Sequence, residues 1–208
     1  MIEIQKLIKR FPVLSSISTS IEEATNILVE CAKKGNTIFT CGNGGSAADA
    51  EHIAGELMKS FVRERPLPKN ELKKLKSLGP EGATLASNLQ KGIRAIPLTG
   101  MPSLSTAYLN DCEPYCIFAQ QVYNLANEGD CLLAISTSGN SPNIVYAAIA
   151  AKAKGVKTIL LSGRNGGKLA DICDENIIVP EQETYIIQEL HLPIYHAICL
   201  EIERQLFN

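Results

Sequence analysis

Residues 37–60 read TIFTCGNGGSAADAEHIAGELMKS and carry the clearest indication of the fold. A short run of β-branched and aromatic residues, 37–40, is followed by a glycine-rich loop, 41–46. A stretch with helical character, residues 47–60, comes next. Strand, loop and helix in this order are typical of a parallel α/β domain, in which each strand leads into a helix that covers the sheet.

The same pattern recurs four times towards the C-terminus. The further predicted strands are residues 95–98, 131–135, 158–161 and 176–179, and helices are predicted near 104–109, over 142–155 and over 183–206. Five strands that alternate with helices predict one doubly wound (flavodoxin- or Rossmann-like) α/β domain over residues 1–208. Its parallel five-stranded sheet would be flanked by helices on both faces.

An N-terminal helical extension precedes the first strand. Residues 1–35 predict two helices, the second beginning at a capping box formed by Ser20 and Glu23 and ending at Gly35. Their apolar side chains are more than one subunit would easily cover, so we expect these helices to serve oligomerisation. These side chains are Ile2, Ile4, Leu7, Ile8, Phe11, Ile21, Leu28 and Val29.

Residues 69–92 are predicted to be a helical insertion in the first crossover. Gly79 and Pro80 would separate its two short helices, because this dipeptide breaks helices. The four lysines between Lys69 and Lys76 are expected to line a solvated helix face rather than a site for an acidic ligand. Since the insertion follows the loop–helix unit of residues 41–60, it is placed to cover a site there or to alter which ligand fits.

Composition and charge exclude several classes of protein. The 208 residues are 45% hydrophobic and 20% charged, which excludes a disordered or fibrous chain. A net charge of −2 provides no whole-chain basic field for nucleic acid, and the longest apolar run, residues 144–151, is too short to span a membrane. Seven cysteines without a CxxC pair, and an N-terminus without a signal-peptide pattern, indicate a reduced, cytoplasmic compartment.

Two loops are candidates for binding a phosphate group. Residues 136–142, STSGNSP, follow a buried strand, and Pro142 suits the first position of the next helix. Hydroxyls and free backbone N–H groups would meet there at the positive end of a helix, which favours an anion, although a well-capped turn is an alternative. Residues 43–46, NGGS, would lie at the same edge of the sheet. Together the loops favour a phosphorylated small molecule; no P-loop lysine or GxGxxG spacing indicates a nucleotide.

His52 and Glu56 are the first candidates for chemistry. They stand four residues apart on the helix that leaves the NGGS loop, so they share one helix face beside the predicted ligand. This spacing suits a metal-ligand pair or an acid–base pair. An ordinary surface contact is the alternative.

The other two histidines lie in the last predicted helix. Gln188 and His196 are eight residues apart, about 12 Å of helical rise. One metal ion can touch both only if the side chains lean together, if Pro193 bends the helix, or if two subunits contribute. We expect His191 to be a structural histidine that is hydrogen-bonded within the core.

Four motifs stand in order along the chain: CGNGGSAADAEH followed by Glu56, the dipeptide Asn110-Asp111, ISTSGNSPN and IQELHLPIYH. Together they resemble the sugar isomerase (SIS) domain, and specifically the phosphoheptose isomerases. The resemblance implies an aldose–ketose isomerase that converts sedoheptulose 7-phosphate to D-glycero-D-manno-heptose 7-phosphate. It also implies a homotetramer with active sites at subunit interfaces and one Zn²⁺ ion per subunit.

By motif position, the resemblance assigns three kinds of site residue. Glu56 would be the catalytic base and His196 the acid in a proton transfer between C1 and C2 through an enediol(ate). The zinc ligands would be His52, Glu56, Gln188 and His196. The substrate contacts would be Asn43, Gly44, Gly45, Ser46, Asn110, Asp111, Ser136, Thr137, Ser138, Ser141 and Gln188. As both ligand and base, Glu56 would have to release or share the metal during turnover.

One position departs from the family pattern. Many phosphoheptose isomerases carry an arginine four residues after the motif glutamate, where this chain has Ser60, and Arg63 or Arg65 is the candidate substitute. Two other functions remain open: a non-catalytic SIS protein that binds a replication initiator or senses a phosphosugar, and an isomerase of a different sugar phosphate. The presence of all four metal positions favours an enzyme.

Overall fold

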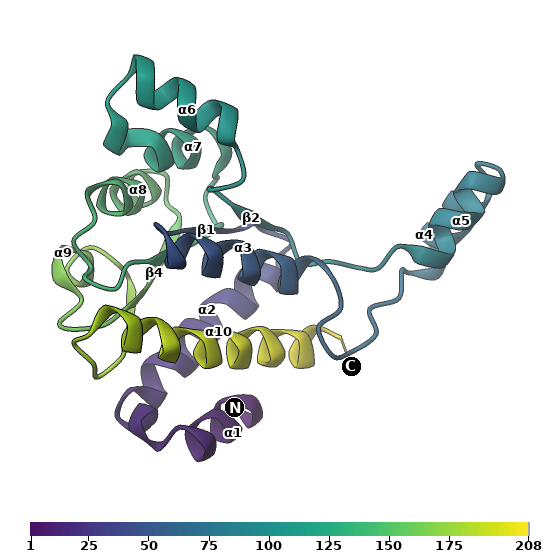
Figure 1. Cartoon of the computed structure of the whole chain (residues 1–208). Coiled ribbons are helices and arrows are strands. Elements are labelled where there is room, and N and C mark those ends of the chain that lie inside the picture. The colour runs from purple at the N-terminus through teal and green to yellow at the C-terminus, as the bar shows by residue number, and fades with distance from the viewer. Residues whose placement is uncertain (208) are drawn as a thin grey trace.

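The computed structural model describes residues 1–207, and its strands form a five-stranded sheet (Figure 1). The strands are β1 (Ile38–Cys41), β2 (Ala95–Pro97), β3 (Cys131–Ile135), β4 (Lys157–Ser162) and β5 (Glu175–Ile178). They lie in the order β2-β1-β3-β4-β5, and every neighbouring pair is parallel. The predicted doubly wound α/β fold is confirmed. The predicted single domain includes residue 208, which lies outside the described residues.

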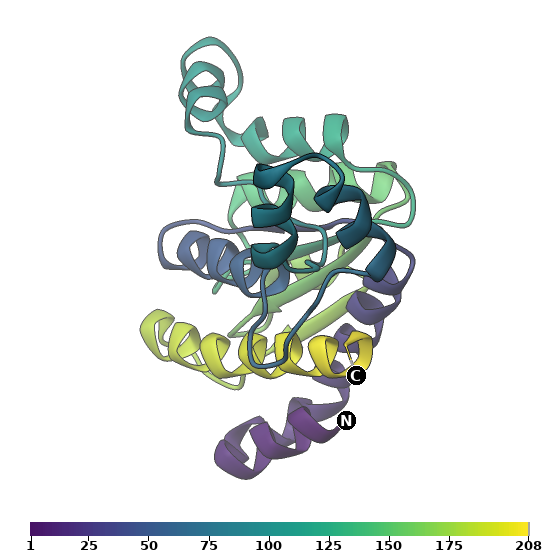
Figure 2. The same cartoon turned by 90° about the vertical axis from the view of Figure 1, so that its right-hand side faces the viewer.

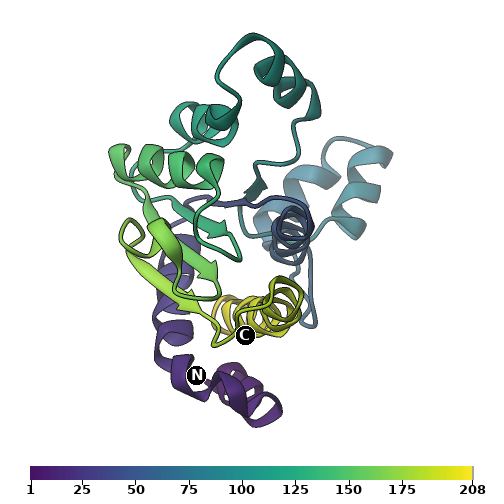
Figure 3. The same ribbon diagram turned by 60° about the vertical axis from the view of Figure 1, so that its left-hand side comes forward.

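Helices cover both faces of the sheet. On one face they are α2 (Ser18–Lys33), α3 (Gly45–Met58) and α10 (Thr184–Leu206), and on the other α7 (Ile117–Leu125), α8 (Pro142–Ala153) and α9 (Gly167–Ala170). Alternate strand residues point to opposite faces, so Ile38 and Leu133 enter the first core whereas Phe39 and Leu132 enter the second. Figure 3 shows the strands between α8 and α10.

The N-terminal extension folds back on its own chain. α1 (Ile2–Arg10) packs against α10, and the 3₁₀ helix η1 (Pro12–Ile17) runs directly into α2. Most of the apolar side chains predicted to be uncovered are buried in the core: Ile4, Leu7, Ile21, Leu28 and Val29. The premise that one subunit cannot cover them is therefore wrong, because α10 covers α1, and α10 and the sheet together cover α2. An oligomerisation role for residues 1–35 stays a prediction.

The second helix begins earlier than its sequence pattern predicts. α2 starts at Ser18, and no side chain caps its N-terminus. Because η1 already supplies the preceding helical turn, Ser20 lies inside the first turn of α2 rather than before it. The predicted capping box at Ser20 and Glu23 is therefore wrong. Gly35, with a positive φ of 74°, follows the helix end as predicted.

The predicted insertion is a helical hairpin that stands away from the domain (Figures 1 and 2). α4 (Lys69–Lys76) and α5 (Pro80–Asn88) pack against each other, with the break before Pro80 as predicted. The α4 lysines are exposed, which confirms the solvated-face interpretation. Figure 1 shows the hairpin extending from the C-terminal end of α3, away from the loops that follow β1 and β3. Within its own chain it does not cover those loops.

The described part of the chain has no membrane-spanning helix, and several of its thiols are buried. No helix within residues 1–207 has both the length and the apolar character needed to cross a bilayer. All seven cysteines are free. Burial raises the pKa of Cys173 to about 11 and that of Cys31 to about 12, so both thiols stay protonated near neutral pH and are poor nucleophiles.

His191 on α10 is fully buried, as predicted, but lacks the expected hydrogen bond. Among the described residues, neither ring nitrogen has a partner. Burial lowers the pKa of His191 to about 4; the nearby Ser162 backbone opposes this shift in part, without a well-formed hydrogen bond to the ring. The imidazole is therefore neutral in the folded protein at pH 5.

This buried ring predicts a loss of stability as the pH falls. Between pH 6.5 and about 4 the unfolded chain binds a proton at His191 that the folded chain does not, so the free energy of unfolding decreases as the pH decreases. The expected loss from pH 7 to pH 5 is about 2 kcal/mol. Urea unfolding of the wild type and His191→Phe at both pH values measures it. The variant should lose correspondingly less stability, and an equal loss in both proteins would contradict the assignment.

Candidate active site

The loops after β1 and β3 lie at the switch point of the sheet. β1 and β3 are neighbours, and the helices that follow them, α3 and α8, cover opposite faces. Ligands of open α/β sheets bind outside the strand ends at such a point. The fold thus brings both predicted phosphate-binding loops to one edge of the sheet.

A pair of side-chain amides joins these two loops. Asn43 Nδ2 donates to Asn143 Oδ1 at 2.9 Å, and Asn143 Nδ2 donates to Asn43 Oδ1 at 2.8 Å. Asn143, in the first turn of α8, was not among the predicted site residues. Its partner is 100 residues away, so only its place directly after the STSGNSP loop could have indicated it. The reciprocal pair fixes the two loops relative to each other.

The hydroxyls of the STSGNS loop are not used to cap α8. The Ser141 side chain makes no capping hydrogen bond; its Oγ lies 3.2 Å from the Ser136 Oγ instead. The Ser138 Oγ accepts a long hydrogen bond, 3.3 Å, from the backbone of Asn140, and Thr137 is half-buried beside it. A well-capped turn would direct a hydroxyl to the free N–H groups of α8. The geometry favours a ligand site over that alternative.

The glycines of both loops permit close approach. Gly139 has a positive φ of 64°, and a Cβ there would collide with the Gly166 carbonyl, so the STSGNS loop packs on the loop after β4. Gly44 also has a positive φ, 55°. A Cβ on Gly45 would lie 2.6 Å from Gln188 Nε2, so the Gln188 amide lies against the NGGS loop. Ser46, the next residue, is buried.

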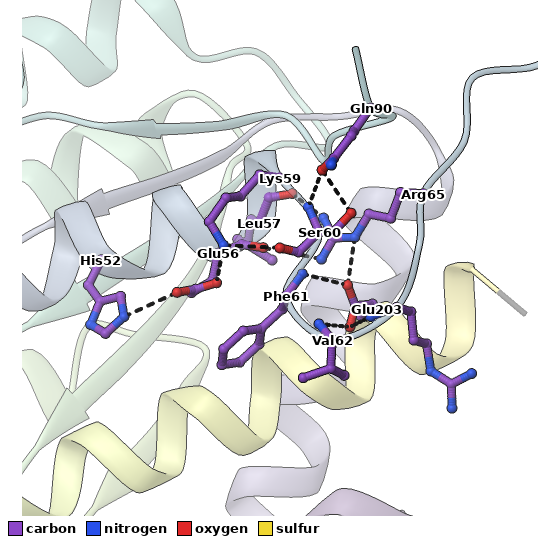
Figure 4. A network of polar contacts seen from close by, with 11 residues as sticks. His52, Glu56, Leu57, Lys59, Ser60, Phe61, Val62, Arg65, Gln90 and Glu203 are labelled. Atoms are coloured by element: carbon purple, nitrogen blue, oxygen red, sulfur yellow. Dashed lines mark hydrogen bonds and ion pairs between the residues drawn. The ribbon is translucent and has the colours of Figure 1, made fainter. Parts of the chain in front are cut away.

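His52, Glu56 and His196 form a cluster on the facing sides of α3 and α10. His52 Nε2 lies 3.3 Å from Glu56 Oε1, and the His52 and His196 ring centroids are 5.0 Å apart. Lys59 Nζ donates to Glu56 Oε2 at 3.1 Å, so the carboxylate lies between His52 and Lys59 (Figure 4). The Glu56 side chain is 13% exposed, which shields it from bulk water while leaving it accessible.

Tyr195 and Asp49 orient His52, and the sequence patterns did not indicate either. The Tyr195 hydroxyl donates to Asp49 Oδ1 at 3.2 Å and lies 3.0 Å from His52 Nδ1. When the hydroxyl hydrogen goes to Asp49, the tyrosine oxygen can accept a hydrogen bond from His52 Nδ1–H. Burial raises the pKa of Tyr195, which keeps this hydroxyl protonated. The other ring nitrogen, His52 Nε2, faces Glu56.

His196 is a neutral imidazole near pH 7. Burial lowers its pKa, the neighbouring His52 lowers it further, and the Glu56 carboxylate opposes these effects in part. Its Nε2 is buried and has no hydrogen-bond partner among residues 1–207. The Phe61 ring covers the imidazole, with centroids 5.5 Å apart. The His196 Nε2 is therefore the polar atom of the ring that still needs a hydrogen-bond or ligand partner.

The chemistry of this cluster fits a metal ion, although the set is incomplete in one chain. The His52 Nε2 lone pair and a Glu56 oxygen repel each other at 3.3 Å unless a cation or a proton lies between them. With His196, these are donors that zinc prefers. Within residues 1–207, however, no three His, Cys, Asp or Glu side chains are placed to ligate one ion.

Gln188 is separate from the cluster. α10 is continuous from Thr184 to Leu206 through Pro193, so the proline does not break the helix between Gln188 and His196. Gln188 lies against Gly45, at the opposite end of α3 from Glu56. The role of Gln188 as a fourth ligand stays a prediction, and a second subunit remains the route by which it would join.

Asn110 and Asp111 are not brought to the loops in this chain. They end α6 (Pro102–Asp111), which has no buried residue, and both are exposed. The Asn110 Nδ2 donates to Asp111 Oδ1 at 2.8 Å. In the described residues no hydrogen bond joins either one to the NGGS or STSGNS loop. Their role as substrate contacts stays a prediction.

Arg65 cannot replace the arginine that many phosphoheptose isomerases carry at the position of Ser60, so the expectation that it could is wrong. Its guanidinium is buried, with Nε 2.8 Å from Glu203 Oε1, and its remaining donors bind the carbonyls of Glu56 and Leu57. Arg63 is exposed and stays the candidate. Because Glu203 is 138 residues from Arg65, no local pattern predicted this pairing.

Comparisons with known proteins agree with this fold and site. Residues 3–90 and 79–163 match the family model of the SIS domain. The phosphoheptose isomerase of Aliarcobacter butzleri (strain RM4018) is 40% identical over 194 residues, which span 93% of this chain and 89% of that protein.

Two solved structures are similar over nearly the whole chain. A phosphoheptose isomerase from Francisella tularensis has a TM-score of 0.77 at 30% identity and covers 96% of this chain and 94% of its own. Phosphoheptose isomerase GmhA from Neisseria gonorrhoeae has a TM-score of 0.73 at 31% identity, with coverages of 98% and 92%.

The five-stranded sheet and the two loops at its switch point therefore define a SIS-domain protein. The relatives narrow the class further. Within the SIS-domain proteins, the chain belongs to the phosphoheptose isomerase family.

Proposed function

We propose that this protein is an aldose–ketose isomerase that converts sedoheptulose 7-phosphate to D-glycero-D-manno-heptose 7-phosphate in the cytoplasm. The observation that carries the proposal is the joining of the NGGS and STSGNS loops by the Asn43–Asn143 amide pair, at the start of helix α3, which carries His52 and Glu56. The two loops, at the starts of α3 and α8, suit a phosphate group. His52 and Glu56, further along α3, can move a proton.

The isomerisation needs a base at carbon and a proton donor at oxygen. Glu56 would remove a proton from C1 of the ketose, giving an enediol(ate), and would deliver a proton to C2 after its own proton can exchange with solvent. His196, as a neutral imidazole, would hydrogen-bond O1 and O2 and carry the proton that must pass between them. The partial burial of Glu56 and His196 limits competition from water.

A zinc ion would be held by His52, Glu56 and His196, with Gln188 contributed from a neighbouring subunit. When bound, it would polarise the sugar carbonyl and the adjacent hydroxyl. Tyr195 and Asp49 support this role for His52, because a hydrogen bond at Nδ1 orients a ligating imidazole and leaves Nε2 free.

The STSGNS loop would hold the phosphate, and its hydroxyls provide a test. Ser141→Ala and Ser138→Ala should each raise KM by about 10-fold or more and lower kcat less, because a lost hydrogen bond to phosphate weakens ground and transition states alike. Ser87→Ala, on the distant helix α5, is the matched control and should leave both constants unchanged. Unchanged kinetics in both loop variants would mean that the loop does not bind the phosphate.

We also propose a homotetramer with active sites between subunits. The separation of Gln188 from His196 along an unbroken helix supports a second chain at each site. Four chains of 22.5 kDa should give a particle of about 90 kDa by light scattering at micromolar concentration. A stable monomer there would contradict this proposal.

The substrate is tested by assaying the purified protein with a panel of sugar phosphates, with and without a chelator. We expect turnover of the seven-carbon ketose phosphate above that of shorter ketose phosphates, and loss of activity on chelation that added zinc restores. A preference for another sugar phosphate would assign a different isomerase. No turnover of any would leave the non-catalytic SIS protein as the better assignment.

A further inference from the structure

A buried ion pair links the two helices that carry Glu56 and His196 (Figure 4). Arg65 Nε donates to Glu203 Oε1 at 2.8 Å, and neither side chain is exposed. Glu203 lies on α10 seven residues after His196, two turns further along the same face. Arg65 belongs to the segment that follows the last turn of α3.

Arg65 uses its other donors on the last turn of α3. Its Nη1 donates to the Leu57 carbonyl at 2.6 Å, and its Nη2 donates to the Glu56 carbonyl at 3.1 Å. The last carbonyls of a helix have no partner within the helix, and a cation placed there satisfies them. The guanidinium therefore fixes the backbone of the residue whose carboxylate is the proposed base.

Glu203 holds the chain that follows α3. Its carboxylate accepts backbone hydrogen bonds from Phe61 at 2.8 Å, Val62 at 3.0 Å and Arg63 at 3.1 Å. Burial alone would raise the pKa of Glu203, but these N–H groups and Arg65 outweigh it, so the pKa lies below its ordinary value and the carboxylate is ionised. Since the Phe61 ring covers His196, the same anchor also sets one wall around that imidazole.

We propose that Arg65 and Glu203 are positioning residues that fix Glu56 relative to His196, an inference that rests on the proposed isomerase function. Neither touches the reacting atoms. A shift of α10 along α3 would break at least one of the hydrogen bonds that meet at this ion pair. Proton transfer is sensitive to such a shift, because a misplacement of about 1 Å can cost about 100-fold in rate.

Arg65→Lys tests the proposal, because lysine keeps the charge but cannot bind Glu203, Leu57 and Glu56 in one fixed fork. We expect kcat to fall about 10- to 100-fold, with KM within about threefold of the wild type. Arg204→Lys is the matched control: Arg204 pairs with Glu201, another buried carboxylate of α10, which binds the start of α1 instead of α3. It should keep kcat within about twofold. Equal kcat values in the two folded variants would overturn the proposal.

Glu203→Gln is the second variant, since the amide keeps the shape and one acceptor oxygen while removing the charge. If both Arg65→Lys and Glu203→Gln fail to fold, while Arg204→Lys folds, the pair is structural and the proposal is overturned. If either folds, it should show the same loss of kcat at nearly constant KM. A KM that rises by as large a factor as kcat falls would also overturn it.

Histidine ring resonances separate this inference from the proposed function, because the chain has only three histidines. In Arg65→Lys the NMR signals of His52 and His196 should shift. The signal of His191, which lies further from Glu203 along α10 than His196 does, should not shift. Unmoved signals would overturn the positioning role whatever the activity. Shifted signals in a protein whose wild type turns over no sugar phosphate would overturn the proposed function alone.

Discussion

Glu56→Gln should lower kcat by about two to four orders of magnitude, the usual cost of a lost general base. Glutamine keeps the size of the side chain and can still accept a hydrogen bond from Lys59, so the local structure should persist. It cannot take a proton from carbon. Sugar phosphate binding, measured by calorimetry, should therefore remain while turnover, measured as aldose formation, is lost.

Glu51→Gln is the matched control for this variant. Glu51 stands on the same helix but is exposed, so its replacement should leave kcat unchanged. Activity of Glu56→Gln close to that of the wild type would show that the glutamate is not the base.

Gln188→Ala should weaken zinc binding by at least about 10-fold and lose activity that added zinc partly restores. The physical reason is the removal of one ligand while Glu56 and His196 remain. Activity measured across a zinc titration gives the apparent affinity, and Gln182→Ala, exposed just before α10, is the control. An enzyme that is metal-free, insensitive to chelator and fully active would contradict the zinc assignment, leaving His52 and Gln188 as substrate contacts only.

The order of strands and helices followed from local patterns. The predicted strand at residues 131–135 coincides with β3, and the last predicted helix differs from α10 by one residue at its start. Such patterns depend on which residues are apolar and where glycine and proline fall, and these features do not need knowledge of distant contacts.

Contacts between distant parts of the chain could not be predicted in this way. Three contacts join residues that are far apart in sequence. They are the packing of α10 on α1, the buried Arg65–Glu203 ion pair and the Asn43–Asn143 amide pair. An arginine is usually exposed, so a solvent-facing Arg65 was the reasonable expectation. Only the fold shows that a carboxylate 138 residues later is its partner.

The candidate site was predicted in part. The spacing of His52 and Glu56 could be read from the sequence because both residues lie on α3. Each of the two loops could be read because it is one continuous stretch before a helix. Their meeting with His196 depends on how α10 packs against α3, and Tyr195 and Asp49 are defined only by that packing. Asn110, Asp111 and Gln188 lie apart from this cluster in a single chain, so their predicted roles depend on the assembly.

The most direct test of the central claim is an NMR assay of the wild type with zinc and sedoheptulose 7-phosphate in D₂O. Proton transfer between C1 and C2 through an enediol(ate) predicts that an aldose 7-phosphate appears and that deuterium from solvent enters at C2 of that product. The Glu56→Gln protein should produce neither signal. A ketose that remains unconverted and unlabelled with active-site zinc present would contradict the account.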